Sequence, residues 1–436
     1  MSTRPLHQLS ASEIHLRVEH GSVTAREIVG AALARIRERE KEIEAWAYLL
    51  DETDLDLEGG ERSGPLGGAP VGIKDIFETR DMPTTWGTHY LRASGSIADA
   101  AAVALLRRAG ATILGKTVST EMAYFAPGST RNPRDVTRTP GGSSSGSAAA
   151  VADCMVPLAL GTQTAGSITR PASYCGIIGY KPTFGTVPTA GVKPFAPTLD
   201  TIGWFARSVA DVALGFAALT ASKDIPPLRR LPMRGLRIGV QALPANTPLD
   251  ADVEQVLADT CHRLTAAGAR VFDLELPRGY DDLVPAHKTI MAYEAARSLA
   301  DEHDRYADQM SAHLAALLEE GIHMSRVLYT DALRQTDEHG HDLNHRLADV
   351  DVVLAPAASG EAPTGHGTTG DPLYSRAWTL LGLPSITLPL GRGRHGLPIG
   401  LQLIAAKHED LRLLEVAQAV TDLAATEAAA LFKDSP

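Results

Sequence analysis

Apolar residues recur at helical spacing in the first fifty positions of the chain. Two segments, Ser10–Glu13 and Thr24–Glu27, have the Ser/Thr-x-x-Glu pattern of a capping box, in which the two side chains bond each other's backbone N–H at the start of a helix. Apolar residues three and four positions apart follow the second box, at Ile28, Ala32, Leu33 and Ile36. The pattern predicts two N-terminal helices.

Farther along, short apolar runs bounded by glycine, proline or polar residues alternate with helical patterns. The runs predict strands at 71–76, 111–114, 236–240, 269–274, 350–354, 385–390 and 398–405. The helical patterns cover 97–108, 249–267, 285–346 and the segment from His408 onward. Alternation of this kind predicts an α/β fold with a large mixed β-sheet. We find no internal repeat and no linker long enough to separate independent domains.

Composition and charge exclude several classes of function. The chain has 436 residues, and its 41 Lys and Arg against 52 Asp and Glu give a net charge of −11, which disfavours nucleic-acid binding. Three cysteines, Cys154, Cys175 and Cys261, are too few and too scattered for a disulfide framework. The N-terminus shows no apolar export segment, and the longest apolar stretch is interrupted by Asp153. We therefore expect a soluble, cytoplasmic protein that does not contact a membrane.

Candidate chemistry gathers in two small-residue segments, 139–147 (TPGGSSSGS) and 161–176 (GTQTAGSITRPASYCG). A flexible linker is the alternative interpretation, but linkers lack such flanking apolar core segments. Small-residue turns at helix starts present backbone N–H groups that suit an anion or a developing oxyanion. Ser167 is a candidate nucleophile, and the N–H groups of Thr164, Ala165, Gly166 and Ser167 are candidates for its oxyanion hole.

A serine nucleophile needs a base, and no histidine stands in an obvious position. Lys74 ends an apolar strand, with Asp75 as its charged neighbour. On residue type alone, a surface lysine paired with Asp75 is the favoured interpretation.

The two segments together with Lys74 resemble the amidase signature family of serine hydrolases. Lys74 precedes Ser143 by 69 residues and Ser143 precedes Ser167 by 24, and both spacings fit the family. The similarity continues through Tyr180–Thr183, Leu199–Gly203, Ala206–Asp211 and Gly396–Gly400, so it covers nearly the whole chain. It implies the amidase signature fold, with helices on both faces of the mixed sheet. It also implies one domain over 1–436, with a signature core at about 65–215 and a pocket-forming part at about 235–430.

The resemblance implies a Ser–Ser–Lys triad. Ser167 would be the acylated nucleophile, Ser143 the bridging serine after a cis peptide bond with Gly142, and Lys74 the base. Lys74 must then be neutral, which requires a pKa well below about 10.4. Thr164, Ala165 and Gly166 would form the oxyanion hole, and neither a cofactor nor a metal is expected.

The sequence departs from the family pattern at Gln163, where aspartate is usual, and at Ala165, where glycine is usual. This variant is similar to compact bacterial members of the malonamidase type, in which an arginine three residues after the nucleophile holds a substrate carboxylate. Carried over, Arg170 is a candidate clamp for the carboxylate of a small amide such as malonamate. Pairing of Arg170 with an internal acid is the alternative. We also expect Gln163 and Ser144 to contact the substrate.

Two hypotheses for the function follow. The first is a stand-alone amidase for a small-molecule amide, for which compact relatives suggest a homodimer. The second is a glutaminase-type subunit of an amidotransferase assembly. Glutaminase subunits usually keep the aspartate and an arginine two residues after the nucleophile, where this chain has Gln163 and Thr169. Met291, where the malonamidase type has a glutamine, indicates a more apolar pocket. Three histidines at 339, 341 and 345 suggest metal ligands only superficially, because they lie on a charged helical pattern.

Overall fold

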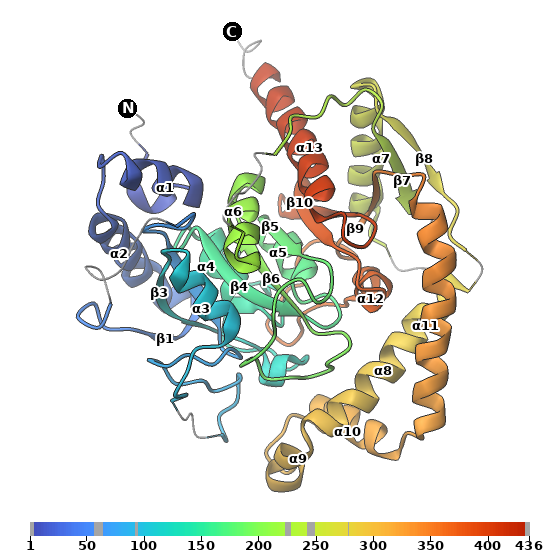
Figure 1. Ribbon diagram of the computed structural model, residues 1–436, viewed down its shortest axis with the longest axis horizontal. Helices are drawn as coiled ribbons and strands as arrows, with labels where there is room; N and C mark the ends of the chain where they lie inside the picture. The colour runs from blue at the N-terminus through green and yellow to red at the C-terminus, as the bar shows by residue number, and fades with distance from the viewer. Residues whose placement is uncertain are drawn as a thin grey trace.

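One mixed β-sheet runs through the molecule (Figure 1). The computed structural model describes residues 4–55, 64–91, 95–222, 228–241, 249–277 and 279–431. Within these residues the sheet has eleven strands, in the order β1-β3-β2-β4-β6-β5-β10-β11-β9-β7-β8. The predicted α/β fold with a large mixed sheet is confirmed.

The strands pair in both directions. Neighbouring strands run parallel in β3-β2-β4 and in β9-β7-β8, while the remaining neighbours are antiparallel. The strands are β1 (Trp46–Leu49), β2 (Pro70–Lys74), β3 (Thr112–Thr117), β4 (Leu158–Gln163), β5 (Ile178–Lys181), β6 (Thr201–Ala206), β7 (Arg237–Gln241), β8 (Arg270–Leu274), β9 (Val352–Pro356), β10 (Ser385–Arg392) and β11 (Pro398–Ile404).

Both predicted capping boxes are present. The Ser10 hydroxyl accepts from the Glu13 backbone N–H at the start of α1 (Ala11–Glu19), and Thr24 and Glu27 make the same exchange at the start of α2 (Ala25–Ile43). The apolar positions predicted for the second helix are buried. Local sequence therefore fixes where both helices begin.

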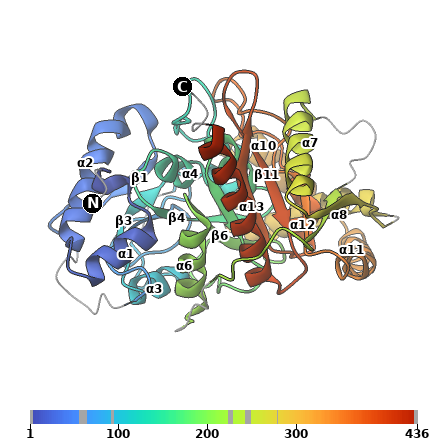
Figure 2. The same ribbon diagram turned by 90° about the horizontal axis from the view of Figure 1, so that it is seen from above.

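Helices cover both faces of the sheet, as expected (Figure 2). On one face, α4 (Ser145–Ala152) packs on β2 and β4, and α5 (Thr169–Cys175) packs on β5, β10 and β11. On the other face lie α6 (Val209–Thr220), α7 (Ala251–Ala266) and α13 (Asp410–Leu431), and α3 (Ala101–Arg108) packs against α6. Every residue of α4 and α5 is buried, so the segments that follow the two serine-containing turns form part of the core. No helix of the described residues is long and apolar enough to cross a membrane.

A helical arm extends from the end of the sheet formed by β7 and β8 (Figure 1). The region predicted as helical at 285–346 is divided into α8 (Leu283–Ser298), α9 (Ala300–Tyr306), α10 (Ala312–His323) and α11 (Arg326–Leu347). Helix α8 packs against α10, α11 and α12 (Leu373–Leu380) around a second apolar cluster. This packing places one face of α8 beside the serine-containing loops.

Candidate active site

Lys74 and Ser143 form a direct hydrogen bond beneath the surface. The Lys74 ammonium, at the end of β2, lies 2.7 Å from Ser143 Oγ and 2.9 Å from Thr162 Oγ1. The Lys74 side chain is fully buried, and Ser143 follows a cis peptide bond with Gly142. The interpretation of Lys74 as a surface residue paired with Asp75 is wrong, because Asp75 instead bonds Thr85 and lies 3.7 Å from Lys116.

Burial changes the protonation of Lys74. Desolvation lowers the pKa of its ammonium from 10.5 to about 7, against an opposing effect of the Asp200 carboxylate. Much of the lysine is therefore neutral at neutral pH and has a lone pair available. Thr162 Oγ1 accepts a hydrogen bond from one N–H of Lys74. Ser143 Oγ is the other neighbour of the amine, and it is placed to exchange a proton with it. This arrangement suits a proton relay between a serine and a lysine base.

Two carbonyl groups of the loop between β4 and α5 have hydrogen-bond partners on α8 and α12. His287 Nε2 lies 2.8 Å from the Thr164 carbonyl oxygen, and the Thr379 hydroxyl donates to the Ala165 carbonyl at 2.8 Å. In a trans peptide the next N–H points opposite to the carbonyl. The N–H groups of Ala165 and Gly166 therefore point away from these partners, and they stay the predicted donors of an oxyanion hole.

The sequence did not point to His287, which is fully buried behind this loop. Its Nδ1 lies 3.0 Å from Arg376 Nη1, so Nδ1 accepts from the arginine and Nε2–H donates to the Thr164 carbonyl. Desolvation, followed by the charge of Arg376, lowers the pKa of His287 to about 3. A neutral imidazole thus links α8 and α12 to the loop. No local motif marks such a residue, because its partners lie 123 and 89 positions away.

Gln163 and Ser144 lie behind the loop, where their side chains are occupied. Gln163 Oε1 accepts from the Ile168 N–H at 2.8 Å and the Thr169 N–H at 3.1 Å, and its amide nitrogen donates to Thr379. Ser144 Oγ bonds the backbone N–H and C=O of Thr162, each at 3.3 Å. Both side chains are buried, and the cavity described below is lined by other residues. In the structure both side chains therefore support the loop, and neither lines the catalytic cavity.

Arg170 is buried and only partly satisfied. Its Nη2 donates to the Gly142 carbonyl at 2.7 Å and to Thr369 Oγ1 at 3.2 Å, while Nε and Nη1 have no hydrogen-bond partner. The guanidinium also lies 5.7 Å from the centroid of the Phe125 ring. Within the described residues it makes no ion pair, so the structure does not support pairing of Arg170 with an internal acid.

Ser143, Ser167 and Arg170 line one small cavity of about 20 Å³, here called the catalytic cavity. This volume is about enough for one water molecule. The rest of its wall is mostly apolar or aromatic, consistent with the apolar pocket expected from Met291; these residues are Ala123, Tyr124, Phe125, Thr164, Ala165, Phe195, Met291 and Pro372. The structure thus brings together two members of the predicted triad and the candidate clamp, with the third member, Lys74, directly behind Ser143.

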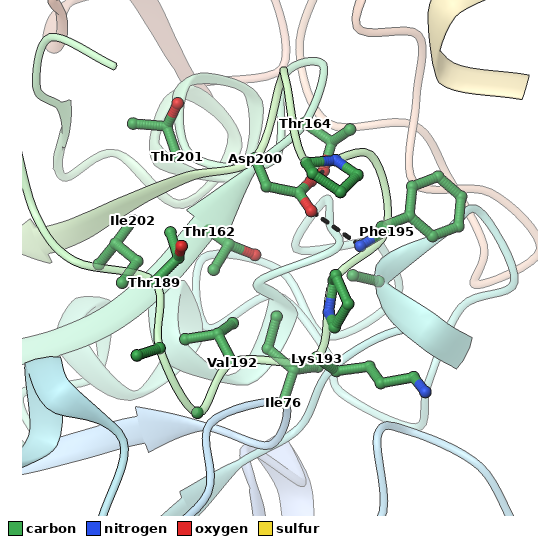
Figure 3. A pocket seen from close by; sticks show the side chains of 15 residues that line it. Ile76, Thr162, Thr164, Thr189, Val192, Lys193, Phe195, Asp200, Thr201 and Ile202 are labelled. Atoms are coloured by element: carbon green, nitrogen blue, oxygen red, sulfur yellow. Dashed lines mark hydrogen bonds between the residues drawn. The ribbon is translucent and has the colours of Figure 1, made fainter. Parts of the chain in front are cut away.

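A larger cavity of about 270 Å³ adjoins the first and shares Ala123, Thr164 and Phe195 with it. Figure 3 shows Asp200 at its wall beside Thr164, with the hydrogen bond that Asp200 accepts from the Phe195 N–H. Burial raises the pKa of Asp200 to about 6, although hydrogen bonds from Thr164, Phe195 and Ala196 oppose the change. Asp200 is therefore mainly ionised at neutral pH.

The described residues contain no group of three or more His, Cys, Asp or Glu side chains arranged to hold a metal ion. His341 and His345 face each other on exposed turns of α11, with 3.2 Å between their Nε2 atoms.

A buried lysine, two serines and a small-residue loop meet at one cavity, and a hydrolase of carbon–nitrogen bonds in amides could use such groups. The chain belongs to the amidase family: the family model described as Amidase matches residues 27–414.

Similar proteins extend over almost the whole chain. The glutamyl-tRNA(Gln) amidotransferase A subunit of Rhodopirellula baltica is 35% identical and is aligned over 93% of this chain and 94% of its own length. The protein of the same name from Halorhodospira halophila is 34% identical and is aligned over 96% of this chain and 98% of its own length. Among solved structures, the native peptide amidase from Stenotrophomonas maltophilia is 27% identical, with a TM-score of 0.82 over 96% of this chain and 97% of that chain. The amidase signature resemblance is confirmed at the level of family and fold.

Proposed function

We propose that this chain releases ammonia from a small carboxamide that carries a carboxylate, as the glutaminase-type subunit of an amidotransferase assembly. The observation that carries the chemistry is the 2.7 Å contact between buried Lys74 and Ser143 beside the cavity that holds Ser167. The observation that carries the substrate class is the unpartnered Nε and Nη1 of Arg170 at the same cavity.

In the proposed reaction, Ser167 Oγ attacks the amide carbon while its proton passes to Ser143, whose own proton passes to Lys74. The N–H groups of Ala165 and Gly166 hold the oxyanion. The proton then returns through Ser143 to the leaving nitrogen, the C–N bond breaks, and ammonia departs. Water hydrolyses the acyl ester by the same relay, which regenerates Ser167 and releases a carboxylic acid.

Arg170 is the proposed partner of the substrate carboxylate. A guanidinium with two free N–H groups suits bidentate binding of a carboxylate, and burial strengthens the attraction. Glutamine and malonamate both present a carboxamide and a carboxylate, so both fit this requirement. They differ in length and in the α-ammonium group that only glutamine carries, and these are the distinctions that the site must make.

The assembly is proposed from the relatives, which are named as subunits of an amidotransferase and align end to end with this chain. A second candidate is a stand-alone amidase for a malonamate-like amide. It is favoured by Gln163 and Thr169, which replace residues that glutaminase subunits usually keep, and by the apolar wall at Met291.

Ammonia release by the purified chain tests both candidates. Glutamine, malonamate and the neutral isostere acetoacetamide are compared, with Ser167→Ala as the blank and Lys74→Ala as a second inactive variant. Preference for glutamine, together with a larger complex when the tagged chain is isolated from its own cells, supports the assembly. Efficient turnover of malonamate by the isolated chain supports the second candidate. Undiminished amide turnover in Ser167→Ala or Lys74→Ala would refute the proposed chemistry itself.

A further inference from the structure

Two buried arginines near the catalytic cavity lack a carboxylate partner. Arg170 is 2% exposed and Arg376 is 5% exposed. Across the described residues, neither guanidinium lies within 4.0 Å of an Asp or Glu oxygen. Desolvation lowers the pKa of both, that of Arg170 to about 10, and the charge of Arg376 contributes to the decrease at Arg170. Buried, unpaired cations are unfavourable, and an anionic ligand is the natural complement of such a pair.

The two arginines face different cavities. Arg170 lines the catalytic cavity, whereas Arg376 lines a separate space of about 450 Å³, here called the outer cavity. The outer cavity is lined by Phe125, Tyr174, Lys288, His313, Ser359, Pro363, Gly367, Thr368, Gly370, Asp371 and Arg376. A single carboxylate on Arg170 would therefore leave Arg376 without a partner.

The lining of the outer cavity carries an excess of positive charge. The two basic residues are Lys288, exposed on α8, and Arg376, buried on α12. The carboxylate of this lining belongs to Asp371, which is exposed; its charge acts on Arg376, but the two side chains form no ion pair. His313, also exposed, lines the cavity as well. Such a lining favours an anion over a neutral or cationic group.

The two cavities adjoin each other. Phe125 lines both, and Asp371 of the outer cavity is followed directly by Pro372 of the catalytic cavity. Helix α8 spans the boundary, because Lys288 faces the outer cavity and Met291, one turn later, faces the inner one. A ligand with its amide at Ser167 would reach Arg376 by extending past Phe125.

We propose that the outer cavity is a second anion-binding subsite, in which Arg376 and Lys288 hold a carboxylate or phosphate group at the far end of the substrate. The inference rests on the proposed function and extends it to carboxamides that bear a second anionic group. Arg170 binds the group near the scissile amide, and Arg376 binds the distal one.

A purely structural role for Arg376 accounts for only part of these observations. Its Nη1 donates to His287, which supports the oxyanion loop. That contact requires neither that Arg376 line a cavity nor that Lys288 line the same cavity. Lys288 is exposed and belongs to none of the contacts that hold the loop, so it separates ligand binding from loop positioning.

Two substrates that differ only at the far end test the proposal. N-succinylglutamine and N-butanoylglutamine share a carboxamide and an α-carboxylate, but the first ends in a carboxylate where the second ends in a methyl group. A phosphonate-terminated analogue distinguishes the two anion classes. We expect kcat/KM to favour the succinyl compound on the order of tenfold, the effect typical of one charge-assisted contact. The ratio should fall toward one in Lys288→Ala and Arg376→Gln, and persist in Lys41→Ala, an exposed lysine of α2.

Binding to Ser167→Ala, measured by calorimetry, repeats the comparison without turnover. Equal affinity for both compounds, or a preference that survives in Lys288→Ala and Arg376→Gln, overturns the subsite. Discrimination in binding without ammonia release by the native chain supports the subsite and overturns the proposed function. Stronger discrimination by the phosphonate assigns the subsite to phosphate rather than carboxylate.

Discussion

The charge of Asp200 should determine the pH at which the enzyme becomes active. Lys74, with a pKa of about 7, is about half neutral at pH 7 and about 10% neutral at pH 6. Because only the neutral amine accepts the proton from Ser143, kcat/KM should rise with pH and level off above about pH 8. With its ordinary pKa of 10.5, Lys74 would be only about 0.3% neutral at pH 8.

Asp200→Asn removes the negative charge that raises the pKa of Lys74, so the acid limb of the profile should move to lower pH. An opposite charge near a titrating group typically shifts its pKa by about 1–3 units. A shift of about one unit would bring Lys74 to about half neutral at pH 6, which is about a fivefold gain in kcat/KM at that pH. The measurement is ammonia release from a saturable amide between pH 5 and 9.

Thr164→Val is the matched control, because it deletes a 2.6 Å hydrogen bond to Asp200 but leaves the carboxylate in place. Losing this hydrogen bond raises the pKa of Asp200 but does not remove its carboxylate, so Thr164→Val should move the acid limb less than Asp200→Asn does. A native profile still rising tenfold per unit between pH 8 and 9, or an Asp200→Asn profile moved to higher pH, would refute the assignment of Lys74 as a desolvated base.

Three further substitutions test the surroundings of the nucleophile. Arg170→Gln should raise KM for carboxylate-bearing amides about 10–100-fold and leave that for neutral amides nearly unchanged, because it removes a charged carboxylate partner; initial rates on paired substrates check this. His287→Leu removes the donor to the Thr164 carbonyl and should lower kcat about tenfold with little change in KM, whereas His287→Gln, which keeps a donor, should retain more activity; equal losses in both variants would contradict a positioning role. Gly166→Ala places a Cβ 2.8 Å from Pro372 Cβ and 3.2 Å from its Cα, so it should displace the loop and lower kcat, and an unchanged kcat would show that the loop tolerates movement.

Much of the fold could be predicted from local pattern, whereas β1 and the neighbouring strands β4, β6 and β5 could not. Capping boxes located α1 and α2, and isolated apolar runs located the strands β2, β3 and β7 to β11 to within a few residues. Strand β1 has only four residues. Strands β4, β5 and β6 were not predicted, because they are buried along their whole length and each contains a glycine. Such strands show no alternation of apolar and polar residues, so only the pairing with their neighbours distinguishes them from loop or helix.

The site shows the same division between local and distant information. The spacing of Lys74, Ser143 and Ser167 carried the resemblance, but neither the depth of Lys74 nor its contact with Thr162 follows from residue type. Gln163 was expected at the substrate because it departs from the family pattern. In the fold its carbonyl oxygen meets the N–H groups that begin α5, a role decided by backbone geometry.

Lys74, Arg170 and Arg376 are buried near Ser167, and burial of their charges lowers the stability of the folded chain. Holding Lys74 with a pKa about 3.5 units below its ordinary value corresponds to about 5 kcal/mol of unfavourable burial of its charged form. The unfolded chain keeps that proton up to about pH 10.5, so the free energy of unfolding rises with pH between about 7 and 10.5. Arg170, with a pKa of about 10, keeps its charge at neutral pH, and no described Asp or Glu lies within 4.0 Å of Arg170 or Arg376, so a bound anion would relieve the desolvation of both. Lys74 is thus suited to begin the reaction neutral and to accept a proton, and the arginines are suited to keep their charge for the ligand.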